Sequence, residues 1–111
     1  MKIRAIAILL LLVLGVSMLV ACSGDAVDYP NVEDFEAALN NGEDLTGKTV
    51  TFTVNKLVPN SAFGYNMQTG EHLNFCSTEN PNVKEGDTVT VEVTEISSML
   101  GSYIIKYELV K

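Results

Sequence analysis

A regular alternation of apolar and polar residues constrains the fold of this chain more than any other feature of its sequence. Val50, Phe52 and Val54 occupy one side of this pattern, and threonines occupy the other. A period of two in β-branched residues is typical of a strand with one buried face. The pattern recurs along the chain, and we expect five strands, at 47–54, 62–68, 72–77, 88–94 and 102–110.

The segments between these stretches have the composition of turns. Pro59-Asn60-Ser61 is expected to break the chain after the first strand, and 78–82 is expected to be a polar loop. Positions 97–101 are expected to form the loop of the last hairpin, although Met99 and Leu100 give its tip an unusual apolar character.

One short helix is expected before the strands. Asn31 is a favourable N-cap residue, and Asp34 three positions later resembles the partner in a capping box. Apolar residues follow at helical spacing, and Asn40, Asn41 and Gly42 end the segment. Five short strands favour a small barrel over a sandwich, which needs about seven. The expected fold is therefore mainly β: a small five-stranded antiparallel barrel preceded by one short helix.

Two motifs resemble the OB-fold, and in particular its tRNA-anticodon-binding-like group. Leu45-Thr46-Gly47-Lys48-Thr49-Val50 is similar to the start of the first strand of that group. Val83-Lys84-Glu85-Gly86-Asp87-Thr88-Val89 resembles the turn into its fourth strand. The resemblance covers about residues 31 to 111 and implies a five-stranded OB-like barrel. The chain departs from the group at 78–82, where a loop replaces the usual helix, and it lacks the basic residues that grip phosphate.

The first 22 residues resemble the signal and lipobox of a bacterial lipoprotein. Lys2 and Arg4 precede an apolar run at 5–20, and Leu19-Val20-Ala21-Cys22 matches the lipobox. The resemblance implies cleavage after Ala21 and acylation of Cys22 with diacylglycerol, commonly palmitate-containing. An uncleaved transmembrane anchor is the alternative, but the run is shorter than the about 20 residues that a spanning helix needs.

The lipobox divides the chain into a signal peptide at 1–21, a lipidated cysteine with a flexible tether at 22–30, and a domain at 31–111. We expect this domain at the extracytoplasmic face of a cell membrane, anchored by the acyl chains on Cys22. The sequence leaves open a Gram-positive or a Gram-negative cell, and it leaves open the oligomeric state. A disulfide between Cys22 and Cys76 is the competing possibility, but the lipid consumes the thiol that it needs.

The part of the chain after the lipobox is strongly acidic. Two of the seven basic residues precede Cys22 and all 14 acidic residues follow it, which leaves five positive charges and a formal charge of −9. Nucleic-acid binders usually present a basic patch, and the lysines here are scattered. The charge therefore disfavours a nucleic-acid partner and direct adsorption on anionic lipid.

The sequence contains no recognisable catalytic set. His72 is the only histidine, and at about 3.3 Å per residue it lies about 13 Å from Cys76 along a strand, too far to share a metal ion. Cys76 is interpreted as a small buried residue rather than a redox cysteine. We expect no catalytic residues, no metal and no cofactor.

A binding surface is the remaining hypothesis. In OB-folds the ligand surface is built on strands two and three and on the loops beside them, which here points to Asn60, Phe63, Tyr65, Asn66 and Asn74. Met99 and Leu100 are added as a contact tip or as a lid.

Strand alternation qualifies that hypothesis. The simplest packing buries Phe63, Met67, Leu73 and Phe75, with Tyr65 on the same side. It leaves Asn66, His72 and Asn74 as an exposed polar strip. An open aromatic platform formed by Phe63 and Tyr65 is the alternative.

These observations favour a membrane-anchored, non-enzymatic binding or accessory domain for an envelope protein, glycan or peptide. Two alternatives stay open at this point. One is a small envelope hydrolase that uses His72 and carboxylates, and the other is a surface binder of single-stranded nucleic acid.

Overall fold

The computed structural model describes residues 26–110. The expected signal peptide, the lipid site Cys22 and the first part of the tether lie outside the described residues, as does Lys111. Within 26–110, no helix combines the length and apolar character needed to cross a membrane.

Helix α2 (Val32–Asn40) begins where the sequence predicts. Asn31 has the extended backbone of an N-cap, and its Oδ1 accepts a hydrogen bond of 2.9 Å from the amide of Asp34. Phe35 and Leu39 are buried, as their helical spacing predicts. The predicted short helix is therefore confirmed.

Six strands follow the helix, so the expected mainly β class is confirmed and the expected count of five is wrong. Their bounds are β1 (Thr49–Thr53), β2 (Lys56–Ser61), β3 (Gly64–Thr69), β4 (Leu73–Ser77), β5 (Thr88–Met99) and β6 (Ser102–Leu109).

The additional strand is β2, which contains the segment predicted to break the chain. It pairs with β3 alone, so it is an edge strand. Proline has no backbone amide hydrogen to donate, and an edge strand tolerates this because one of its sides has no neighbouring strand. The pairing is irregular between Val58 and Ser61, on either side of Pro59-Asn60. The proline therefore distorts the strand and does not end it.

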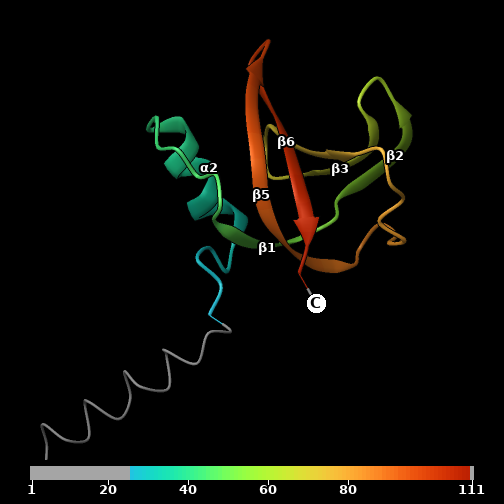
Figure 1. The fold of residues 1–111 in the computed structure, drawn as a ribbon, viewed down its shortest axis with the longest axis horizontal. Helices are drawn as coiled ribbons and strands as arrows, with labels where there is room; N and C mark the ends of the chain where they lie inside the picture. The colour runs from blue at the N-terminus through green and yellow to red at the C-terminus, as the bar shows by residue number, and fades with distance from the viewer. Residues whose placement is uncertain (1–25, 111) are drawn as a thin grey trace, which may run out of the picture.

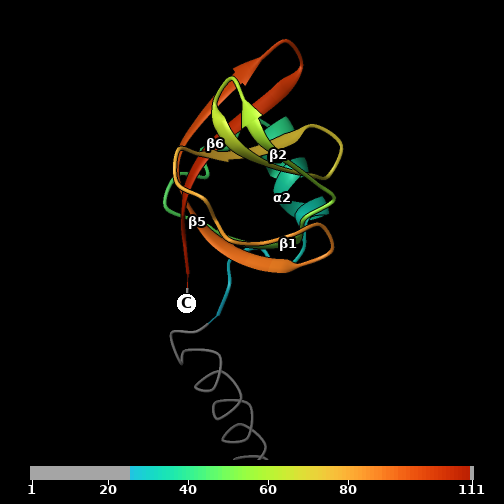
Figure 2. The same ribbon diagram turned by 90° about the vertical axis from the view of Figure 1, so that its right-hand side faces the viewer.

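The strands form one curled, open sheet rather than the closed antiparallel barrel that we expected. Their order is β1-β5-β6-β4-β3-β2, and β4 pairs with β6 in parallel. Strands β1 and β2 are thus the two edges, although only Val54 and Asn55 separate them in the chain. The amide of Val54 donates to Asp87 beside β5, whereas the amide of Asn55 donates to Gln68 in β3. Figure 2 shows the curl that results.

The hydrophobic core fills the concave side of this curl. Phe52 of β1 and Phe75 of β4 stack with their ring centroids 4.3 Å apart. Phe35 reaches from α2 to this pair, and its ring centroid lies 6.0 Å from that of Phe75. Helix α2 therefore packs against the concave side of the sheet, beside β1 (Figure 1).

Strands β5 and β6 form a long hairpin that projects from the sheet at the end away from residue 26 (Figure 1). Pairing continues to Met99 and Ser102, so the expected loop at 97–101 is shortened to a turn of Leu100 and Gly101. Both turn residues have positive φ, +51° and +84°, as a type I′ turn requires.

Candidate functional site

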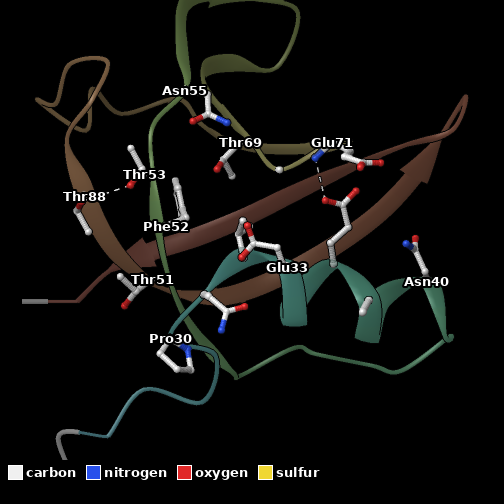
Figure 3. Close-up of a pocket in the computed structure, with 15 residues that line it drawn as sticks. Pro30, Glu33, Asn40, Thr51, Phe52, Thr53, Asn55, Thr69, Glu71 and Thr88 are labelled. Atoms are coloured by element: carbon white, nitrogen blue, oxygen red, sulfur yellow. Dashed lines mark hydrogen bonds between the residues drawn. The ribbon is translucent and has the colours of Figure 1, made fainter.

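A groove of about 710 Å³ lies between α2 and the sheet. This volume is within the range of about 300–1,000 Å³ that is usual for ligand pockets. Figure 3 shows that the wall opposite α2 is formed by β1, the β1–β2 link and the turn after β3. The groove is therefore bounded by segments that are distant in the sequence.

Polar side chains line most of the groove. Helix α2 contributes Glu33 and Asn40, while Asn55, Thr69 and Glu71 line the opposite wall (Figure 3). Phe52 gives the floor an apolar surface. Such a lining suits a ligand that forms several hydrogen bonds and carries positive charge.

Glu36 fixes the position of one groove wall relative to the other. It is only 7% exposed, and its carboxylate accepts hydrogen bonds from the amides of Glu71 (2.9 Å) and His72 (3.0 Å). The imidazole Nδ1 of His72 lies 3.1 Å from the same carboxylate and donates a third bond. These bonds satisfy a buried charge and tie α2 to the turn between β3 and β4.

One backbone edge of the groove is also built by the helix entry. The amide of Tyr29 donates to the carbonyl of Thr49, and the amide of Thr51 donates to the carbonyl of Tyr29, both at 2.9 Å. Tyr29 thereby adds one residue in parallel to the free edge of β1. Its ring packs edge-on against Phe35, with centroids 5.5 Å apart.

A second, smaller hollow of about 300 Å³ lies on the other side of the β3–β4 turn. His72, Asn74, Gln68 and Ser102 are among its lining residues. The side chain of His72 is half-exposed here, so the Glu36–His72 pair lies between the two hollows.

Comparisons of the chain with protein-family models, with curated proteins and with solved structures gave no match. The functional argument for this chain therefore depends on the geometry of its own residues.

Two of the predicted binding residues form a direct pair. Asn66 Nδ2 donates to Asn74 Oδ1 at 3.1 Å, and Asn74 Nδ2 donates to the carbonyl of Tyr103 at 3.1 Å. Asn66 is only 6% exposed, and its Oδ1 has no partner among the described residues. The expected exposed strip of Asn66, His72 and Asn74 is therefore wrong at Asn66.

The predicted aromatic residues do not form one surface. Phe63 is 42% exposed, which contradicts its expected burial, because it lies in the turn between β2 and β3 rather than in a strand. Tyr65 is half-buried and Asn60 is exposed on β2. Phe63 therefore lies outside the core side of β3. The two residues do not form the aromatic platform that was the alternative expectation.

The hairpin tip is strongly exposed. Leu100 is 99% exposed, and Met99 beside it is also exposed. Neither residue lines the groove or the second hollow, so the tip is not a lid over either one.

Cys76 is buried, as predicted from its residue type. Burial raises the pKa of its thiol, so the thiolate that redox chemistry needs is disfavoured. Burial, together with the nearby Cys76 and Glu79, also raises the pKa of Tyr107 to about 12. The hydroxyl of Tyr107 has no partner among the described residues.

The sequence reasoning missed Glu36. A glutamate near the start of a helix is ordinarily explained by its favourable interaction with the helix dipole, and Glu36 does not figure among the residues expected to bind. A positional signal was present: Glu36 follows Val32 by four residues and precedes Leu39 by three, so it lies on the apolar face of the helix. A carboxylate on that face needs donors, and β3–β4 supplies them. Among the described residues, no three His, Cys, Asp or Glu side chains are placed to hold a metal ion.

Proposed function

We propose that this chain is a bacterial lipoprotein, anchored through acylated Cys22 at the extracytoplasmic face of a membrane, whose domain binds an envelope ligand without catalysis. The observation that carries the binding function is the polar groove between α2 and the sheet, whose two walls are joined through Glu36. A groove with fixed walls loses little conformational entropy when it binds a ligand.

We further propose that this open, curled sheet is a variant of the OB-fold. The parallel pairing of β4 with β6 supports this, as does the passage of the chain from β1 to β2 within two residues. In this interpretation β1 and β2 are the two halves of one bent first strand, which pairs with β5 on one side and with β3 on the other. The interpretation concerns the fold alone and implies no ligand.

Obstruction of the groove tests the binding function. Ala37 lines the groove from an exposed position of α2, where arginine is a good helix former. Full-length protein in detergent micelles is immobilised and exposed to fractionated envelope protein, glycan and peptide. We expect a fraction that is retained by the wild type and released by Ala37→Arg.

Glu43→Arg is the matched control, because it adds the same side chain at an exposed position outside the groove. Retention that is equal in all three proteins would exclude the groove. If no fraction is retained by the wild type, the binding function itself is wrong.

One observation favours a hydrolase as the second candidate. The buried Glu36 carboxylate orients the imidazole of His72 through Nδ1, as the acidic member of a catalytic triad does. Ser102 lines the same hollow as His72 and provides a hydroxyl there. Hydrolysis of a panel of esters and amides that is lost in both His72→Ala and Ser102→Ala would promote this candidate. Activity that survives His72→Ala would eliminate it.

A further inference from the structure

The outer edge of β1 is open over a short stretch that faces the groove. The carbonyl of Thr49 and the amide of Thr51 are both bonded to Tyr29 on the side away from β5, so by alternation the backbone groups of Thr53 also point away from β5. Tyr29 occupies this outer edge as far as the amide of Thr51. The carbonyl of Thr51 and both backbone groups of Thr53 follow on this outer edge, and no described residue outside β5 forms a backbone hydrogen bond with them.

The chain itself shows that this edge accepts an extended segment. Tyr29 binds to it as a parallel bridge, and on the other side of the gap the amide of Asn55 is bonded to β3. The gap is therefore a vacant length of an edge that is occupied at both ends. An exposed row of unpaired amides and carbonyls is a template for an added strand.

The charges around the gap determine which side chains an added strand should carry. Glu33 on α2 and Glu71 after β3 are exposed and line the groove, and neither forms an ion pair with another described residue. Their carboxylates attract lysine or arginine side chains and repel phosphates. The formal charge of −9 expected for the chain after the lipobox also attracts basic ligands and repels acidic ones.

We propose that the groove binds a basic peptide segment in extended conformation, which adds to β1 as a strand along Thr51–Thr53. A peptide fits better than a glycan, because its backbone supplies the donors and acceptors that a strand edge requires at strand spacing. This inference rests on the proposed binding function and names the ligand class for the same groove.

Hydrogen exchange gives a direct test. The full chain in detergent micelles is titrated with a capped seven-residue peptide of alternating valine and lysine, and with its valine–glutamate counterpart. We expect the lysine peptide to slow exchange of the Thr53 amide. The amide of Val54 is already bonded to Asp87 at 2.8 Å and serves as the internal reference.

A proline at position 53 tests the backbone contact by affinity. The Thr53 amide points away from β5, like the Thr51 amide that is bonded to Tyr29, so Thr53→Pro removes the outer donor and leaves the β1–β5 hydrogen bonds in place. Thr53→Val is the matched control, because it keeps the amide and loses only the hydroxyl. We expect peptide binding to weaken about tenfold or more in the proline variant, the loss that corresponds to one hydrogen bond and a steric block. The valine variant should bind like the wild type.

The two carboxylates are tested together. Glu33→Gln combined with Glu71→Gln should weaken binding of the lysine peptide and reduce its dependence on salt. Glu43→Gln, outside the groove, should change neither property.

Strand addition is overturned if the Thr53 amide is not protected, if Thr53→Pro binds as well as Thr53→Val, or if the glutamate peptide binds equally well. If Thr53→Pro unfolds, the exchange result decides alone. Release of an envelope glycan by Ala37→Arg, with no binding of the lysine peptide, would keep the proposed function and refute this inference. If the wild type retains no envelope fraction and does not bind the lysine peptide, the proposed function and the strand-addition inference are both refuted.

Discussion

Glu36 and His72 are bonded to each other twice, although they lie in different elements and are 36 positions apart in the chain. The Glu36 carboxylate accepts from the backbone amide of His72 and from its imidazole. It also accepts from the amide of Glu71, so one buried side chain holds the turn after β3 against α2. This contact joins the two walls of the groove.

Replacement of Glu36 should therefore loosen the helix. Glu36→Ala removes three acceptor contacts, and we expect the free energy of unfolding to fall by about 2 kcal/mol. Urea denaturation measures the change. Glu43→Ala, at an exposed position, should stay within about 0.5 kcal/mol of the wild type. Equal effects of the two substitutions would show that the Glu36 contacts add nothing to stability.

The segment before α2 should respond to acid. The backbone amide of Thr49 donates to the Asp28 carboxylate, and this bond lowers the pKa of Asp28 below its ordinary 3.8, assisted by the Thr49 hydroxyl and by Lys48. A lowered folded-state pKa means that the contribution to stability is complete above the unfolded-state pKa and is lost as the pH falls through the folded-state pKa.

Asp28→Asn should therefore make the stability of the domain less dependent on pH in the acidic range. Melting temperatures from pH 6 downwards should fall less steeply for this variant than for the wild type. Parallel curves would mean that the Asp28–Thr49 contact is absent in solution.

Two glycines with almost the same φ allow the cost of a steric clash to be measured separately from the cost of the backbone conformation. A Cβ at Gly64 would collide with the carbonyl of Ser77 on β4, whereas a Cβ at Gly86 would meet nothing within 4 Å. Their φ angles are +95° and +94°, so the conformational cost of alanine is matched. We expect Gly64→Ala to lower the free energy of unfolding by at least about 1 kcal/mol more than Gly86→Ala. A difference near zero would refute the close approach of β3 to β4 at this point.

The hairpin tip contains a residue that is costly for stability. Leu100 has a φ of +51°, a conformation that costs an L-residue about 1 kcal/mol, and its side chain is in water. Leu100→Asn places the preferred Asn-Gly pair in a type I′ turn and should raise the free energy of unfolding by about 0.5–1 kcal/mol. Leu100→Ala keeps the unfavourable backbone and should give no such gain. Thermal unfolding of the two variants distinguishes them.

The proposed acylation of Cys22 gives the remaining prediction. Cys22→Ala should leave the chain uncleaved by the lipoprotein peptidase and unlabelled by alkyne palmitate in cells. Cys76→Ala is the control and should be labelled like the wild type. Labelling of Cys22→Ala at the wild-type level would refute the lipoprotein assignment.

Local sequence patterns predicted the individual helix and strands better than they predicted how the strands assemble into a sheet. The threonine–valine alternation of β1 and the cap at Asn31 depend on neighbours in the chain, and both are correctly placed. Pro59 was misread because a proline breaks a central strand but is tolerated at an edge, and the sequence does not show which strand is an edge. The extension of β5 to Met99 was missed because a two-residue turn with Leu100 at positive φ is atypical for leucine.

The candidate site was less predictable, because it depends on segments that meet only in the folded chain. Glu36 finds its donors 35 and 36 residues away, and no local pattern indicates those partners. Phe63 was assigned to the core by a period-two pattern that in fact begins after the turn. The pairing of Asn66 with Asn74 follows from the β3–β4 register, which the sequence did not establish.

The attachment of Asp28 and Tyr29 to β1 also determines where a mechanical load enters the domain. Any pull on the chain that precedes Asp28 reaches the sheet through the hydrogen bonds between Asp28 and Thr49, and then through the two hydrogen bonds of Tyr29 to Thr49 and Thr51. Rupture of those bonds would free the β1 edge from Thr49 to Thr53 and lengthen the vacant stretch beside the groove. Tension on the chain before Asp28 is thus coupled to the amount of strand edge that the domain exposes.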